Sequence, residues 1–549
     1  MTRSDLDPIT LDIMWGRMLA TVNEQAAALM RSSFTSIVRD AGDLSACVFD
    51  RQGRMVAQAV TGSPGHINSM ATGMTHIVEA FPVDTLEPGD VIITNDPWIT
   101  VSQLHDITIA TPVFHQGRTV ALFANCCHAL DIGGRGLSAD ARSIFEEGLF
   151  LPIMKLHEAG KPVKPIYQII EKNVRTPDEV IGDIHAQIIA NEVGARQLQS
   201  FLEEFRLDDI EVIADAIIER SERAMRSAIN ALPDGEHSFA LTLDGFGQPI
   251  EIKSAVTITG DGITVDYDGT SDMVDLGVNV GFNYTVAYTT YGVKCAIAPD
   301  VPNNAGSFLP IRTLAPEGCI LNARSPAAVA GRHTVGHFLP SAIMGALSGI
   351  LPDKVMAPGA DSLWNTHIAG YDARDGAYFS YTWFSTGGTG ALQGQDGLSA
   401  TSYPSGVAGV PAEIIEALTP LVVSERALRP DSGGAGEHRG GLGQTMTIEV
   451  RTDRPYLFSG LYERCEHPAP GLDGGRSGAT GAIETSNGVE LEPKISRMLP
   501  ADTVVTLHIP GGGGFGDPTE RSAAAIREDI EDGYVTPAGV RRDYGIDPD

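Results

Sequence analysis

Helical and extended patterns alternate along the first part of the chain. Apolar residues recur over residues 8–36 at close to the 3.6-residue period of a helix, and Asp7-Pro8 is a suitable helix start. Residues 44–49 are apolar without a break and are followed by a turn with Gly53, which predicts a buried strand and a hairpin. Residues 70–81 are helical in pattern, and residues 90–94 form a short apolar run.

The pattern changes several times after this region. Residues 176–235 are amphipathic and almost free of proline, which predicts long helices, whereas later residues alternate and are rich in glycine. We therefore expect an α+β fold, a large mixed chain of several domains. The predicted parts are an N-terminal α+β region (1–175), a helical segment (176–235), a β-rich central region (236–430), a C-terminal β region (431–518) and a helical tail (519–549).

Composition excludes several classes of function. The 549 residues carry 39 Lys and Arg against 70 Asp and Glu, a net charge of −31. Such a chain lacks the basic surface that binds nucleic acid or an anionic membrane. Residues 1–8 have no apolar segment of signal-peptide type, and the six cysteines form no CxxC pair. We expect a cytoplasmic protein with reduced thiols.

Glycine-rich segments invite a nucleotide-binding interpretation, which the residues do not support. The Gly160-Lys161 pair is followed by Pro162, so no P-loop is present. Residues 511–516 spell GxGxxG after a predicted strand, but the chain ends too soon for the second strand of a dinucleotide fold. We therefore predict a tight structural turn there and no ATP site in this chain.

A predicted hairpin carries the strongest candidate chemistry. Strands 106–114 and 119–127 are joined by a turn at 115–117, so Asp106 and His128 should lie side by side. A carboxylate and an imidazole at strand ends can form half of a metal site, or can simply hydrogen bond to close the hairpin. His105 should face the opposite side of the sheet from Asp106, because side chains alternate along a strand.

Other polar residues stand among glycine and apolar neighbours. Asp43 precedes a buried strand, and is either a turn residue or part of a site. The histidines His66, His333 and His337 are each, taken alone, more often structural than catalytic. A cysteine nucleophile at Cys126 or Cys127 is disfavoured, because no base and orienting group accompany it.

Several long motifs, taken in order, resemble those of the hydantoinase B family, which includes the B subunits of ATP-dependent N-methylhydantoinase and 5-oxoprolinase-type enzymes and the α subunit of acetone carboxylase. The resemblance runs nearly end to end. The segments that carry it are Arg39–Asp50, Thr94–Trp98, Asp106–Phe114, His128–Gly134, Gly394–Ser402, Arg429–Gly443 and Pro510–Pro518.

The resemblance implies a partner and a metal. The B subunit pairs with a larger A subunit that binds ATP and activates the substrate, and it holds a divalent ion, Mn or Zn. Carried over, the ligands are Asp43, Asp106 and His128. The first His of the family's His-x-x-Asp segment falls on Gln103, a weak neutral oxygen ligand; Asp131 or a water could fill the gap.

The function implied is that of a metal-dependent subunit completing the hydrolysis of a cyclic amide, in a dimer of heterodimers with the A subunit. A metal-bound water would attack the activated carbon, and His66 or Asp131 would orient or deprotonate it. Two alternatives stay open: a subunit of an ATP-dependent ketone carboxylase of the acetone or acetophenone type, and a metal-free scaffold subunit, which the glutamine at 103 favours.

Overall fold

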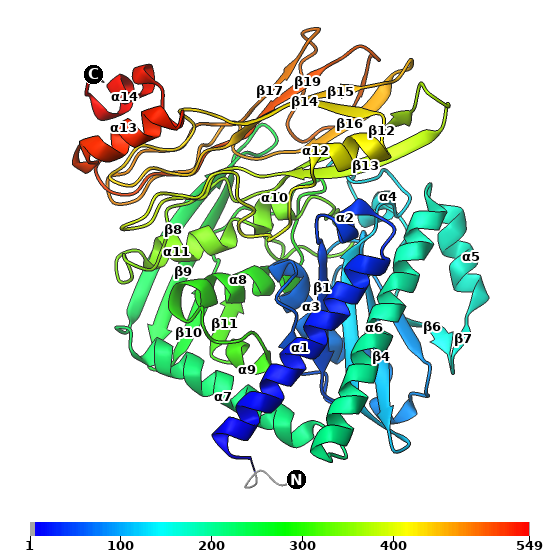
Figure 1. Cartoon of the computed structure of the whole chain (residues 1–549). Helices are drawn as coiled ribbons and strands as arrows, with labels where there is room; N and C mark the ends of the chain where they lie inside the picture. The colour runs from blue at the N-terminus through cyan, green and yellow to red at the C-terminus, as the bar shows by residue number, and fades with distance from the viewer. Residues whose placement is uncertain (1–5, 548–549) are drawn as a thin grey trace.

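The computed structural model describes residues 6–547 and confirms the predicted α+β class, with four sheets and helices packed around them (Figure 1). The N-terminal sheet has seven strands in the order β2-β1-β5-β4-β3-β6-β7, and all neighbours are antiparallel. Its strands are β1 (Leu44–Phe49), β2 (Met55–Gln58), β3 (Val91–Thr94), β4 (Asp106–His115), β5 (Arg118–His128), β6 (Met154–Glu158) and β7 (Lys161–Pro162).

Helices cover both faces of this sheet. On one face, α1 (Pro8–Ser32) and α6 (Pro177–Phe205) share a core with Ala46 and Val48 of β1. On the other face, α3 (Pro64–Ala80) packs against Cys47 and Phe49 of the same strand. Since every position of β1 is buried, its sequence is a continuous apolar run instead of an alternating one. The remaining N-terminal elements are α2 (Ser36–Arg39), η2 (Val83–Thr85), α4 (Ile144–Glu147) and α5 (Lys164–Asn173).

The helix predicted over residues 8–36 is shorter than expected. It begins as predicted, with the Asp7 side chain accepting hydrogen bonds from the backbone N–H groups of Ile9 and Thr10. It ends at Ser32, where the hydroxyls of Ser32 and Ser33 bond to helix carbonyls and compete with the backbone.

The central region combines a four-stranded sheet with helices. Its order is β11-β10-β9-β8, and only the β10–β11 pair is parallel. Helix α8 was not predicted, because it is buried on most sides and so lacks an amphipathic period. The elements are α7 (Glu211–Asn230), β8 (Gly235–Leu243), β9 (Ile250–Thr259), β10 (Gly262–Asp266), α8 (Phe282–Ile297), α9 (Ala305–Phe308), β11 (Ile311–Leu314), α10 (His333–Gly336) and α11 (Leu339–Leu347).

Two four-stranded antiparallel sheets, β13-β12-β16-β18 and β14-β15-β19-β17, share one core in the last third of the chain and lie across the top of Figure 1. The strands are β12 (Trp364–Tyr371), β13 (Tyr378–Ser385), β14 (Leu421–Leu428), β15 (Gln444–Val450), β16 (Tyr456–Leu461), β17 (Ala482–Thr485), β18 (Arg497–Leu499) and β19 (Val505–His508). The helices are α12 (Ala412–Leu418), η3 (Pro518–Glu520), α13 (Ala523–Glu531) and α14 (Pro537–Tyr544). The predicted domain boundaries stay a prediction.

The prediction of a tight turn at the glycine run 511–516 is wrong, because the run is a buried, mainly extended segment. Gly512 donates a backbone hydrogen bond to Gly441 and accepts one from Gly434. A Cβ at Gly512 would lie 1.9 Å from the carbonyl oxygen of Thr389, so backbone fills the space that a side chain would need. This packing leaves no cradle for a phosphate.

No helix between residues 6 and 547 is both long and apolar enough to cross a membrane.

Candidate functional site

A small buried cavity lies where the three regions of the chain meet. Its volume is about 30 Å³, which is room for a water molecule or a small polar group. It is lined by Asp43, Ser63, His66, Gln103, His128, Tyr284, Arg332, His333, His337, Leu363, Asn365, Phe384, Ser405 and Val407. The site therefore depends on the whole fold, not on one region.

The β4–β5 hairpin forms the centre of the site as predicted. Asp106 pairs with His128 across the two strands, and Nδ1 of His128 lies 2.9 Å from Oδ1 of Asp106. The start of β1 brings Asp43 alongside: its carbonyl oxygen accepts the backbone N–H of His128, and its Oδ2 lies 4.0 Å from Nδ1 of that residue.

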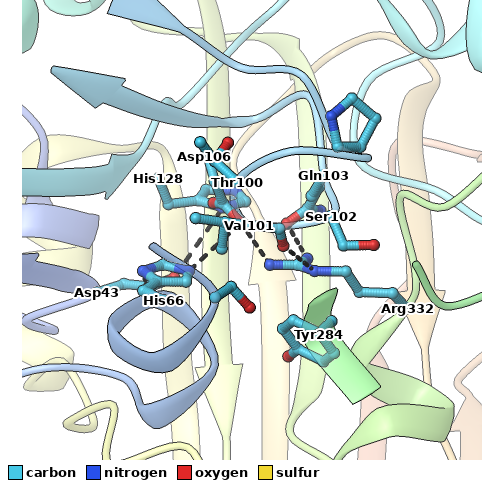
Figure 2. Close-up of polar contacts among 12 residues, drawn as sticks. Asp43, His66, Thr100, Val101, Ser102, Gln103, Asp106, His128, Tyr284 and Arg332 are labelled. Atoms are coloured by element: carbon cyan, nitrogen blue, oxygen red, sulfur yellow. Dashed lines mark hydrogen bonds and ion pairs between the residues drawn. The ribbon is translucent and has the colours of Figure 1, made fainter. Parts of the chain in front are cut away.

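His66 enters this centre from the first turn of α3 (Figure 2). Its Nε2 lies 3.3 Å from Oδ2 of Asp106 and its Nδ1 lies 3.6 Å from Oδ1 of Asp43. Burial opposes the charged imidazole, but the two carboxylates outweigh burial and raise the pKa of His66. Burial likewise opposes the charged carboxylate of Asp106, yet the adjacent His66 and Arg332 hold its pKa well below the usual range. An imidazole with a carboxylate at each ring nitrogen is equipped to take up and release a proton.

Arg332, at the start of α10, is a site residue that the sequence did not reveal. It is 3% exposed, and its Nη2 forms an ion pair with Oδ2 of Asp106 while its Nη1 donates to Oε1 of Gln103 (Figure 2). Its Nε donates to the carbonyl oxygen of Val101 at 2.8 Å, and the guanidinium lies 4.4 Å from the ring centre of Tyr284. The only signal in the sequence is its place among polar residues in the segment 331–337.

His333 and His337 line the same cavity as neutral imidazoles. Burial and the adjacent Arg332 lower the pKa of His333 to about 3, and burial with His333 holds the pKa of His337 well below its usual value. Three buried ring nitrogens have no hydrogen-bond partner among the described residues: Nε2 of His333, Nδ1 of His337 and Nδ1 of His66. Unpartnered buried nitrogens cost about 1–3 kcal/mol each, so the cavity has the character of a ligand site.

Other candidate residues lie outside the cavity. Asp131 accepts hydrogen bonds from the backbone N–H of Gly133 and from Nη1 of Arg175, so its carboxylate is engaged elsewhere. The ring of His105 stacks on that of His128, with 5.3 Å between the ring centres. His105 precedes the first residue of β4, so the strand alternation used for the prediction does not apply to it, and its predicted placement on the opposite side from Asp106 stays a prediction. All six cysteines are free, and burial raises the pKa of Cys126 well above its usual value. That shift disfavours a thiolate nucleophile.

The residues predicted to hold a metal do not form a metal cage as they stand. Two of the four, Gln103 and Asp106, bond to the Arg332 guanidinium, and Asp106 also bonds to His128. In the part of the chain that the structure describes, no group of three His, Cys, Asp or Glu is arranged to hold a metal ion.

A larger cavity of about 500 Å³ adjoins the buried one. It shares two short segments of wall with it: Gly62 and Pro64 flank Ser63 of the small cavity, and Pro404 and Gly406 flank Ser405. Its lining is mainly apolar with a few polar groups, which is typical of a binding pocket for a small molecule.

A large α+β fold that converges on one buried centre of acids, histidines and an arginine is the architecture of an enzyme or enzyme subunit. The chain belongs to the hydantoinase B/oxoprolinase family, whose model matches residues 7–518.

Named relatives of the chain match it over nearly its whole length. It is 30% identical to the B subunit of a putative D-/L-hydantoinase from Pseudomonas sp. strain NS671, over 98% of this chain and 95% of that one. The solved structure of the ATP-dependent caprolactamase of Pseudomonas jessenii matches with a TM-score of 0.90 and 28% identity, over 99% of this chain and 97% of that chain. A nucleotide-free structure of acetone carboxylase has the same fold, with a TM-score of 0.87 and 20% identity over 98% and 80% of the two chains.

Proposed function

We propose that this chain is the subunit that completes the hydrolysis of a small cyclic amide after a partner subunit has activated the amide with ATP. Relatives described as the B subunit of a hydantoinase and an ATP-dependent caprolactamase support this proposal. The observation that carries it is the His66 imidazole, buried between the carboxylates of Asp43 and Asp106 at the edge of a cavity.

A partner is part of the proposal, because neither of the two glycine-containing segments considered for phosphate binding forms a site for ATP in the part of the chain that the structure describes. Its glycine-rich run is buried against backbone, and Gly160-Lys161 is followed by Pro162. The partner is an ATP-binding subunit of the hydantoinase A type, and the assembly is a dimer of heterodimers. The larger cavity of about 500 Å³ is the place for the ring of the substrate, since it is mainly apolar and its wall includes neighbours of Ser63 and Ser405, which line the small cavity.

The reaction balances with two waters. The partner transfers the γ-phosphoryl group of ATP to the amide oxygen, which makes the amide carbon electrophilic. Water adds to that carbon, the C–N bond breaks with a proton delivered to nitrogen, and a second water releases phosphate. His66 receives the proton of the attacking water and delivers a proton to the ring nitrogen, which is the work of a general acid and base. The products are the ring-opened amino acid, ADP and phosphate.

Co-purification followed by substrate screening tests the proposal. The chain is co-expressed with the A-type subunit, and the complex is supplied with ATP and either hydantoins, 5-oxoproline and lactams or simple ketones with labelled bicarbonate. We expect a stable complex whose ADP release depends on a cyclic amide and yields a ring-opened product. Labelled carboxylate formed from a ketone would show the carboxylase alternative instead. Separate elution of the two chains at micromolar concentration would refute the proposed partner.

A further inference from the structure

The Arg332 guanidinium occupies the centre of the buried site as a fixed cation. Hydrogen bonds and an ion pair hold it to three acceptors: the carbonyl oxygen of Val101, the side-chain oxygen of Gln103 and the carboxylate of Asp106. The ring of Tyr284 covers one face at 4.4 Å. The arginine therefore has one defined position, not a range of them.

Gln103 is complementary to this arginine. Its amide oxygen accepts from the guanidinium, and its Nε2 donates to the carbonyl oxygen of Ala330 at 2.6 Å. Ala330 lies two residues before Arg332, so the glutamine bonds both the guanidinium and the segment that carries it. The departure from the family's histidine at 103 and the arginine at 332 are thus parts of one arrangement.

The segment that carries Arg332 is fixed from a second side. The backbone N–H groups of Val329 and Ala330 donate to Oε1 of Glu147 at 2.6 and 2.7 Å. The buried side chains of Gln103 and Glu147 therefore both hold the backbone segment 329–330, which leads to Arg332. An arginine in such a setting is a permanent part of the site and not a side chain resting in a vacant space.

We propose that Arg332 is the resident cation of this site, in place of a divalent metal, and that the chain works without a bound metal ion. Of the five N–H bonds of a guanidinium, three are directed at the acceptors named above. The others are free to donate to an oxyanion in the cavity that Arg332 lines, where His333 and His337 also present unpartnered nitrogens. The ligand class is an oxygen carrying negative charge, such as the activated amide oxygen or its phosphoryl group. The binding of a reacting oxyanion by Arg332 rests on the proposed function. The inference that the chain holds no metal ion does not depend on that function.

Metal content tests the proposal directly and independently of activity. The chain and its complex are purified from medium supplemented with Mn²⁺ and Zn²⁺, and metal is measured by mass spectrometry and by calorimetric titration. We expect well below one equivalent of either metal, and the same for Gln103→His, because the guanidinium still bonds to Asp106. One equivalent of tightly bound metal in the wild type, or a metal gained by Gln103→His alone, would overturn the proposal.

A double variant tests whether metal binding appears once the arginine is removed. Gln103→His with Arg332→Asn removes the guanidinium and restores an imidazole beside Asp106, and we expect it to bind Mn²⁺ or Zn²⁺ at least tenfold more tightly than the wild type. An exposed arginine changed in the same way, Arg374→Asn, is the control and should gain nothing. A folded double variant that binds metal no better than the wild type would also overturn the proposal. If the double variant does not fold, the wild type and Gln103→His decide the question.

Discussion

Glu147 is a buried acid whose protonation should govern the stability of the segment leading to Arg332. It is 1% exposed, its Oε1 accepts the N–H groups of Val329 and Ala330, and its Oε2 has no partner among the described residues. Burial raises the pKa of Glu147 to about 8, although the two backbone donors oppose the shift. The acid is therefore neutral in the folded chain at neutral pH.

The size and sign of the pH effect on the free energy of unfolding follow from the difference in the Glu147 pKa between the folded and unfolded chain. The pKa of Glu147 is about 8 in the folded chain, against an ordinary glutamate value of 4.5 in the unfolded chain. At pH values between these two, the folded chain binds one more proton than the unfolded chain. Stability therefore falls as pH rises through this window, by about 5 kcal/mol in all at about 1.4 kcal/mol per unit. Glu147→Gln mimics the neutral acid and keeps the acceptor, so it removes this loss. The advantage of the variant should grow from about 1 kcal/mol at about pH 5.5 to about 5 kcal/mol at about pH 8.5.

Calorimetric unfolding across this pH range measures the effect. For a chain of this length, about 5 kcal/mol corresponds to a rise in Tm of about 4 °C. The matched control is Glu158→Gln, an exposed glutamate on β6, which should follow the wild type at every pH. A difference between Glu147→Gln and wild type that does not change with pH, or a variant less stable at both ends, would refute the reasoning.

Two further predictions concern glycine packing and Asp131. Gly512→Ala would place a Cβ 1.9 Å from the carbonyl oxygen of Thr389 and should destabilise the chain by about 3 kcal/mol or more. Gly16→Ala lies in helix α1, where an added Cβ would meet no atom within 4 Å, and should stabilise the chain by about 0.5–1 kcal/mol. Calorimetric unfolding of the two variants beside the wild type measures both effects. Asp131→Asn should lower Tm slightly by weakening the bond to Arg175 and leave kcat within about threefold. A hundredfold loss of kcat at unchanged Tm would instead support the catalytic role that the sequence predicted for Asp131.

The sequence predicted the centre of the site because local rules determine it. The alternation of β4 and β5 and the turn between them set the register, and the register alone places Asp106 beside His128. From its place before an uninterrupted apolar strand, Asp43 was either a turn residue or part of a site. The resemblance to the family then connected these residues as candidate ligands.

The rest of the site depends on contacts between distant segments. Arg332 reaches Asp106 across 226 residues of sequence, from a segment without helical or strand periodicity. Helix α8, which supplies Tyr284, is buried on most sides and shows no amphipathic pattern. Since such pairings have no local signature, sequence reasoning predicted a metal at residues where the structure has an arginine, and the metal stays a prediction for the experiment above to decide.

The ratio of ADP to ring-opened product in the complex tests most directly whether the buried centre of this chain opens the activated amide. The wild-type complex should release about one ADP per ring opened. In a complex with His66→Gln, the partner should still consume ATP while the ring-opened product falls about a hundredfold, so the ratio should rise far above one. His76→Gln, at an exposed position of the same helix, is the control and should keep a ratio of about one. If the His66→Gln complex forms product at the wild-type rate and ratio, the buried centre is not where the amide is opened.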